Sequence, residues 1–213
     1  MTLSTEEHCL EFVKENAKKG DPKSVIDNID KYCYDVEWMM NVGDEKGAFI
    51  DQLILKYRPQ TIVELGGYVG YSAIRFASVL ASINPTARYF SFELNPQFVS
   101  IMNEMIKLSN LKNITIIPGS FEKNYKKLKT DFKIDQVDFI FLDHWKDAYL
   151  PDIKLMEKEG ILHNDSVIVA DNVINPGAPD YLEYVRNNPK FYHNETINSS
   201  MEYTKGKEFD ALQ

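Results

Sequence analysis

The sequence is poor in cysteine, lacks any long apolar run and carries no excess of basic residues. Its two cysteines, Cys9 and Cys33, show no metal-ligand spacing, so we expect free thiols in a reducing compartment rather than a disulfide. No apolar stretch approaches the roughly 18 to 20 residues of a membrane helix, and the first twenty residues have no signal-peptide pattern. These absences predict a cytoplasmic protein with no membrane partner.

Charge and composition limit the kinds of partner and the number of domains that we expect. Acidic residues outnumber basic ones, 32 against 24, and the net charge of −8 disfavours capture of nucleic acid and suits small cationic or metal-bound ligands. No stretch rich in proline, glycine or serine marks a linker, and 213 residues suit one sizeable domain. We expect a single domain over 1–213, with a helical cap at 1–60 and an α/β core at 61–213, as a monomer or alternatively a dimer.

Hydrophobic periodicity changes at residue 61. Before it, apolar residues recur at helical spacing, Asp21 and Pro22 suit the start of one helix, and another is expected around 44–57. After it, short apolar runs alternate with amphipathic segments, as in repeated βα units. The expected strands are 61–65, 89–94, 114–118, 137–143 and 166–171, and the expected helices 71–83, 96–109, 121–130 and 149–159.

The alternation predicts a doubly wound, mostly parallel α/β sheet with helices on both faces. Residues 191–200 and 201–209 read as a final pair of strands, which we expect to be antiparallel. In such sheets the ligand lies beyond the carboxyl ends of the strands, so the polar residues at those ends are the candidates for function.

The first two strand ends carry the signals for a nucleotide-like cofactor. Gly66, Gly67 and Gly70 would let a ligand approach the backbone, but their spacing only loosely matches the G-x-G-x-x-G fingerprint, and a plain βα turn is the alternative. Glu93 ends the second strand and could accept both hydroxyls of a ribose. Its alternative role is that of an acid near the start of the helix at Pro96.

Two later strand ends carry oxygen donors and a lysine. Asp143 and Asp171 each end a predicted strand, and Asn172 follows Asp171. If these two strands are neighbours, the three residues form the set of hard ligands that Mg²⁺ prefers; a turn or cap role is the alternative for either acid alone. Lys146 lies one turn past Asp143, and a nearby dication would lower its pKa and make it a usable base. A solvated surface lysine is the alternative. His144, next to Asp143, could equally be a packing residue.

Five segments together resemble the catechol O-methyltransferase family. They are "NVGDEKG", "ELGGYVGYS", "FLDHWKDAYLPD", "ADNVINPGAPD" and "SSMEYTKG", and they follow that family's order over nearly the whole chain. The resemblance implies a Rossmann-like methyltransferase fold, S-adenosylmethionine as cofactor, Mg²⁺ as metal and a small-molecule catechol as methyl acceptor.

The resemblance also implies roles for individual residues. Asp143, Asp171 and Asn172 match the metal ligands, Lys146 the general base, and Glu202 the acid that holds the second catechol hydroxyl. The implied substrate contacts are Trp38, Asp143, Lys146, Asn172, Pro176 and Glu202, with Trp38 and Pro176 as apolar walls. The implied cofactor contacts are Met40, Val42, Gly66, Tyr68, Ser72, Glu93, Ser120, Glu122, Asp143, His144 and Trp145.

The chain departs from the family pattern at a few positions. Where vertebrate members have "GASQ" at the adenine, this chain has "GSFE", so Phe121 replaces a polar residue while Glu122 could still accept from the adenine amine. Met39 and Met201 replace smaller or branched residues near the expected ring pocket, and we expect an altered substrate preference. The pattern also leads us to expect that the chain stops short of the family's last strand.

The implied reaction is a direct methyl transfer. A catechol has a pKa near that of a phenol, about 10, so Mg²⁺ would stabilise the catecholate, Lys146 would take the proton and the oxygen would attack the methyl carbon in line. Three alternatives stay open: a methyltransferase for another chelating phenol such as a caffeoyl ester or flavonoid, a nicotinamide dehydrogenase, and a non-catalytic binding module. The dehydrogenase leaves Asp143 and Asp171 unexplained, and the binding module predicts decay of the acceptor site.

Overall fold

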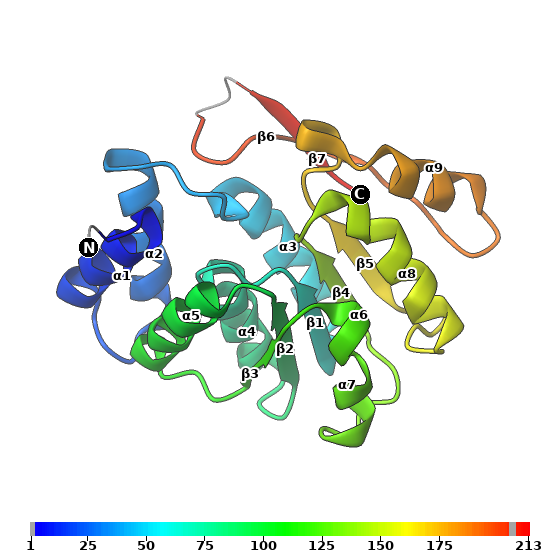
Figure 1. Ribbon diagram of the computed structural model, residues 1–213, viewed down its shortest axis with the longest axis horizontal. Coiled ribbons are helices and arrows are strands. Elements are labelled where there is room, and N and C mark those ends of the chain that lie inside the picture. The colour runs from blue at the N-terminus through cyan, green and yellow to red at the C-terminus, as the bar shows by residue number, and fades with distance from the viewer. Residues whose placement is uncertain (1–2, 205–207) are drawn as a thin grey trace.

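A parallel five-stranded sheet with helices on both faces forms the centre of the computed structural model, which describes residues 3–204 and 208–213 (Figure 1). The strands are β1 (Thr61–Leu65), β2 (Arg88–Glu93), β3 (Ile114–Pro118), β4 (Phe139–Leu142) and β5 (Val167–Ala170). Their order is β3-β2-β1-β4-β5, so the strand order reverses between β1 and β4. This confirms the predicted doubly wound topology, and it places the crevice for a ligand above the carboxyl ends of these two strands.

Alternate residues of each strand contribute to two separate cores. Ile62, Phe139 and Phe141 pack into the first core with the helices up to residue 109, whereas Ile140 and Leu142 pack into the second core with the later helices. Both faces of the central strands are therefore apolar, which is why the strands read as continuous hydrophobic runs. The helices between strands are α4 (Tyr71–Ile83), α5 (Pro96–Ser109), α6 (Phe121–Asn124), α7 (Lys126–Thr130) and α8 (Tyr149–Lys158).

The predicted helical cap is confirmed and consists of α1 (Thr5–Asn16), α2 (Pro22–Asp35) and α3 (Gly43–Tyr57). Asp21 caps α2 by accepting from the Ser24 N–H at 3.2 Å, with Pro22 in the first turn, as the sequence indicated. The helices α1 and α2 pack on α4 and α5 at one end of the molecule, and α3 packs along α4 (Figure 1). Within the described chain, no helix has the length and apolar character to cross a membrane.

The final strands lie later in the chain than expected. They are β6 (Ile197–Ser200) and β7 (Phe209–Leu212), and they are antiparallel as predicted. The segment expected to begin the second strand instead forms a turn after Met201. In this turn the Tyr203 hydroxyl donates to Asp30 of α2, which holds the segment against the cap. Part of the expected strand, 205–207, lies outside the described residues.

The antiparallel pair is joined to the parallel sheet at its edge. Gln213 and Ala170 exchange two backbone hydrogen bonds, at 2.9 and 3.0 Å, which brings the end of β7 beside the carboxyl end of β5. Between β5 and β6 the chain forms a π-helical turn (Val173–Gly177) and α9 (Pro179–Asn187). Strand β7 therefore reaches the same edge of the sheet as the candidate metal ligands.

Candidate active site

The loop after β1 is shaped by its glycines and by Glu93. A Cβ on Gly66, where φ is +96°, would collide with the Asp143 carbonyl oxygen, so no side chain fits there. One Glu93 oxygen accepts from the N–H groups of Gly67 and Tyr68, at 3.1 and 2.8 Å, and the other accepts from Asn95 at 2.7 Å. Glu93 therefore clamps the glycine loop, and only its remaining lone pairs are available to a ribose. The N-cap of α5 is Asn95, and Glu93 accepts from its N–H, so the alternative role of Glu93 as an acid near the start of α5 is also seen in the structure.

A second acid of this region, Glu64, was missed in the sequence. Glu64 lies inside β1, is fully buried and accepts from the hydroxyls of Ser72 and Ser91. Burial raises its pKa to about 7, an effect that the two serine hydroxyls only partly offset. The signal was present, because an acid in the middle of the apolar run "TIVEL" needs a buried partner.

The side chains of Asp143, Asp171 and Asn172 meet at the carboxyl ends of β4 and β5. The Lys146 ammonium lies 3.3 Å from both Asp143 Oδ1 and Asn172 Oδ1, so these two oxygens face a common point. Asp171 Oδ2 is buried and has no hydrogen-bond partner among the described residues. Two carboxylates, one of them with an oxygen that lacks a partner, and an amide oxygen are a donor set that fits a hard divalent cation.

The electrostatics of the two acids agree with that fit. Burial raises the pKa of Asp143 above its ordinary value, against the opposing effect of Lys146 and Lys46. Burial and repulsion from Asp143 raise the pKa of Asp171 as well. Two carboxylates that resist ionising together are stabilised when a cation lies between them.

Lys146 is not a solvated surface lysine. Besides its contacts to the two oxygens, its ammonium donates to the Tyr149 hydroxyl at 2.6 Å, and only 15% of its side chain is exposed. The Tyr149 hydroxyl in turn lies 2.7 Å from the Leu142 carbonyl and 3.0 Å from the Asp171 carbonyl, which fixes it between β4 and β5. The structure thus holds Lys146 at the strand ends with its ammonium beside the candidate metal ligands.

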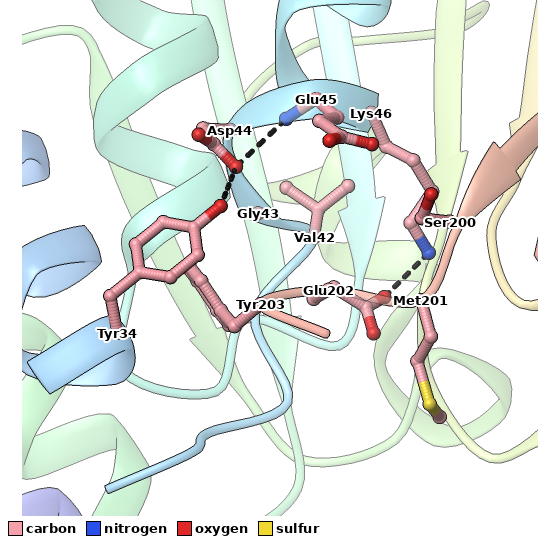
Figure 2. Close-up of a pocket in the computed structure, with 10 residues that line it drawn as sticks. All are labelled: Tyr34, Val42, Gly43, Asp44, Glu45, Lys46, Ser200, Met201, Glu202 and Tyr203. Carbon is pink, nitrogen blue, oxygen red and sulfur yellow. Dashed lines mark hydrogen bonds and ion pairs between the residues drawn. The ribbon is translucent and has the colours of Figure 1, made fainter. Parts of the chain in front are cut away.

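A buried lysine that was not singled out in the sequence, Lys46, lies at the centre of an acidic cluster. Its ammonium is 2.5 Å from Asp171 Oδ1, 2.5 Å from Glu202 Oε1 and 2.9 Å from Asp210 Oδ2, and the residue is 2% exposed. Figure 2 shows its side chain extending from α3 toward the Glu202 carboxylate. Burial lowers the Lys46 pKa, but the three carboxylates together hold it above its ordinary value, so the residue is cationic.

That ammonium decides between two possible metal sites. Within the described chain, oxygens of Asp171, Glu202 and Asp210 lie within 4.8 Å of one another, as metal ligands would. Lys46 already lies at the centre of this trio and offsets part of its negative charge, whereas Asp143 Oδ1 and Asn172 Oδ1 face the ammonium of the less buried Lys146. Asp143, Asp171 and Asn172 therefore stay the predicted metal ligands.

His144 and Trp145 take different positions beside this site. His144 Nε2 lies 3.0 Å from Asp152 Oδ2 and its ring stacks on Tyr149, so the residue packs against α8. Trp145 is 76% exposed, which leaves its indole face open to a flat ligand. Both residues follow β4, but His144 packs against α8 and Trp145 is exposed to solvent.

Near the expected adenine position, Phe121 points into the protein. It is buried and packs edge to face on Phe92, with ring centroids 5.1 Å apart. Its ring therefore belongs to the second core. Glu122 is exposed, and the Ser120 hydroxyl is buried without a hydrogen-bond partner among the described residues.

Three apolar residues that the resemblance assigns to the reactants are exposed. Trp38, Met40 and Pro176 are exposed, and the Trp38 indole N–H donates to the Glu202 carbonyl at 2.9 Å, which fixes the ring beside the acid. Met201 lies near this rim, where its sulfur is 3.8 Å from the Asn175 amide. Met39, in contrast, is buried in the first core, so it does not lie on this exposed rim.

Two hollows of the described surface are not the reactant site. The cavity drawn in Figure 2, lined by Val42 and Glu202 among others, has a volume of about 10 Å³, which is too small for either reactant. A groove of about 490 Å³ lies beside α7 and the segments that enter β4 and β5. It is therefore at the amino ends of the strands, on the opposite edge of the sheet from the polar cluster.

The chain is similar in sequence to known O-methyltransferases. A model of the O-methyltransferase family matches residues 16–202. Catechol O-methyltransferase of Mus musculus is 44% identical over 201 residues, which cover 94% of this chain and 74% of the mouse protein. Catechol O-methyltransferase B of Danio rerio is 43% identical over 210 residues, which cover 98% of this chain and 78% of the fish protein.

Solved structures share the fold at low sequence identity. An O-methyltransferase from Bacillus cereus in complex with SAH has a TM-score of 0.70 and 19% identity, covering all of this chain and 90% of that one. An O-methyltransferase from Streptomyces achromogenes in complex with SAM has a TM-score of 0.68 and 16% identity, covering all of this chain and 88% of that one. These likenesses support the Rossmann-like architecture described above.

Proposed function

Because this chain belongs to the catechol O-methyltransferase family of O-methyltransferases, we propose that it transfers a methyl group from S-adenosylmethionine to one hydroxyl of a Mg²⁺-chelated catechol. The observation that carries the proposal is the meeting of Asp143, Asp171 and Asn172 beside Lys146 at the carboxyl ends of β4 and β5. Membership in this family argues against the nicotinamide dehydrogenase, and the intact acceptor residues argue against a binding module.

The cofactor would lie over the glycine loop. The N–H groups at the start of α4 are placed for its anionic end, and Glu93 has lone pairs left for the ribose, whereas the buried Ser72 hydroxyl already donates to Glu64. The exposed Trp145 indole offers an apolar face to the adenine, and Met40 on the rim would lie near the sulfonium. The relatives bound to SAM and SAH are consistent with this donor.

The metal would be held by Asp143, Asp171 and Asn172, and when bound it supplies positive charge that stabilises the catecholate. Glu202 Oε1 is engaged by Lys46 and by the Asn172 amide, which leaves its second oxygen to accept from the other catechol hydroxyl. Trp38 and Pro176 would hold the ring from its two faces.

Lys146 would take the proton of the reacting hydroxyl. The oxygen then forms a bond to the methyl carbon while the carbon–sulfur bond breaks in line, and the electron pair returns to sulfur. The protein contributes chiefly by holding the two reactants at near-attack distance, an effect that can supply roughly 7 to 11 kcal/mol. No covalent enzyme intermediate is required.

Methyl transfer to catechol, with and without Mg²⁺, tests the proposal. With labelled S-adenosylmethionine and Mg²⁺ we expect a mono-methylated product, and a chelator should abolish its formation. Resorcinol is the matched control, because its two hydroxyls are too far apart to chelate one ion. Equal turnover of both diols, or turnover that persists in chelator, would contradict the proposal.

A panel of phenols with adjacent hydroxyls tests which of them is the preferred methyl acceptor. A caffeoyl ester and a flavonoid carry the same adjacent hydroxyls on larger frames, which Met201 at the rim would contact differently from a simple catechol. We expect the highest kcat/KM for a small catechol. A clear preference for the ester would retain the chemistry but change the substrate class.

A further inference from the structure

We propose that Asp210 is a positioning residue of the metal site, which orients the Asn172 amide so that its oxygen faces the ion. The inference rests on the proposed function, since it takes Asn172 as a metal ligand. Asp210 lies on β7, in a segment that matched no motif of the sequence, and it is completely buried.

Both carboxylate oxygens of Asp210 accept hydrogen bonds, from Lys46 and from the segment 172–177 after β5. We call this segment the metal loop, because it carries the proposed ligand Asn172. Its Oδ2 accepts from Asn172 Nδ2 at 2.7 Å and from the Lys46 ammonium at 2.9 Å. Its Oδ1 accepts from the backbone N–H groups of Asn175 at 3.1 Å and Ile174 at 3.4 Å. One carboxylate therefore holds both the side chain of Asn172 and the backbone that follows it.

These bonds leave the Asn172 amide one orientation. Its two amide hydrogens are used by Asp210 Oδ2 and by Glu202 Oε1, the latter at 3.0 Å. Its oxygen then faces the point that it shares with Asp143, marked by the Lys146 ammonium at 3.3 Å. A flipped amide would direct its oxygen at two carboxylates and its hydrogens at the metal. Repulsion on both sides of the amide therefore disfavours the flipped orientation.

Lys46 stabilises this arrangement electrostatically. A buried carboxylate without a counterion carries a large desolvation cost, and Lys46 is the cation shared by Asp210, Glu202 and Asp171. Because Lys46 comes from α3 and Asp210 from β7, the cap and the last strand meet at the metal loop. The same loop carries Pro176, so Asp210 also fixes the base of a proposed substrate wall.

Asp210→Asn tests the inference, because it preserves size but places an N–H₂ group against donors. We measure binding of Mn²⁺, a paramagnetic substitute for Mg²⁺, by electron paramagnetic resonance. We expect its affinity to fall roughly 10- to 100-fold, as for other residues that orient metal ligands. Affinity for S-adenosylmethionine without metal should be unchanged.

Two further variants separate positioning from general damage. In an Asn172→Ala background, Asp210→Asn should cause no further loss of Mn²⁺ affinity, because the group it acts through is absent. Asp138→Asn is the matched control: Asp138 accepts from the N–H groups of Gln60 and Thr61 at the amino end of β1. It should lower stability while Mn²⁺ affinity stays that of the wild type.

The outcomes distinguish the inference from the proposed function. If Asp210→Asn binds Mn²⁺ like the wild type, the inference is overturned. If Asp143→Ala binds Mn²⁺ like the wild type, the proposed metal site itself fails. If Asp210→Asn does not fold, the inference is tested by hydrogen exchange of the Asn172 side-chain amide in the metal-free wild type. We expect slow exchange, because Asp210 and Glu202 hold both amide hydrogens. Fast exchange would overturn the inference.

Discussion

Lys146 is the residue on which the proposed proton transfer depends. Its ammonium is held by Tyr149 and lies beside Asp143 and Asn172, so its position is fixed before a substrate arrives. We predict that Lys146→Ala lowers kcat by roughly 10² to 10⁴, the usual contribution of a general base, while S-adenosylmethionine binding survives. Single-turnover kinetics and calorimetry measure the two effects. Lys129→Ala, at an exposed lysine paired with Asp135, is the control and should change neither.

Turnover of Lys146→Ala near the wild-type value would remove the assignment of this lysine as base. The position of its ammonium would then be explained by its contacts with Asp143, Tyr149 and Asn172, without a role in proton transfer.

Glu64 gives a prediction on stability and pH. Its pKa is about 7 in the folded protein and about 4.3 in an unfolded chain, so the folded state binds the proton more tightly. Wild-type stability therefore falls as pH rises from about 4 to 7, and Glu64→Gln escapes this loss. We expect the variant to be more stable by about 3 to 4 kcal/mol at pH 8, and by little at pH 4.

Urea unfolding of the ligand-free protein at both pH values measures the Glu64 effect. Glu122→Gln, at an exposed acid, is the control and should show no such difference. A gain for Glu64→Gln that is the same at pH 4 and pH 8 would contradict the raised pKa.

Single residues were predictable where a charge interrupts an apolar strand end. Asp143, Asp171 and Glu93 follow such runs, so the parallel-sheet rule placed them at one edge. Lys46 and Asp210 gave no comparable signal, because one lies in an amphipathic helix and the other in a short final segment. Their burial is created only when α3 and β7 meet, which no local pattern encodes.

At the scale of elements, the turn from β1 into α4 is the most constrained. Gly66 has positive φ and its position is closed by the Asp143 carbonyl. We predict that Gly66→Ala destabilises the protein by more than the roughly 1 kcal/mol that a strained backbone alone costs, and weakens cofactor binding. Thermal unfolding and calorimetry with S-adenosylmethionine measure these effects.

Gly160→Ala is the control for that prediction. Gly160 also has positive φ, +68°, but no atom of the described residues lies within 4 Å of the place that a Cβ would take there. It should therefore show only the cost of backbone strain. Equal effects of the two substitutions would mean that the close approach between the chain ends after β1 and β4 does not contribute to stability or to cofactor binding.

The elements with strong periodicity were predicted closely, and those set by long-range contacts were not. The strand β1 and the helices α4 and α5 match their expected ranges, since each has a regular apolar pattern. The expected helix 121–130 is divided at Tyr125 into α6 and α7. The final strand pair shifted because Tyr203 bonds to Asp30, a contact across most of the chain.

At the scale of the whole molecule, three parts of the chain meet at one edge of the sheet. The cap contributes Lys46 and Trp38, the strand ends contribute the metal ligands, and the last segment contributes Glu202 and Asp210. The Tyr68 hydroxyl also donates to Glu6 of α1, which ties the glycine loop to the cap. The proposed reactants would thus be held where these parts join, and the site depends on all of them.

The most direct measurement is a crystal structure with Mn²⁺, S-adenosylmethionine and a nitrocatechol inhibitor, in which anomalous scattering locates the ion. The account predicts one peak about 2.1 Å from an oxygen of each of Asp143, Asp171 and Asn172, chelated by both inhibitor oxygens. A peak among Asp171, Glu202 and Asp210 with Lys46 displaced, or no peak at this edge of the sheet, would contradict it.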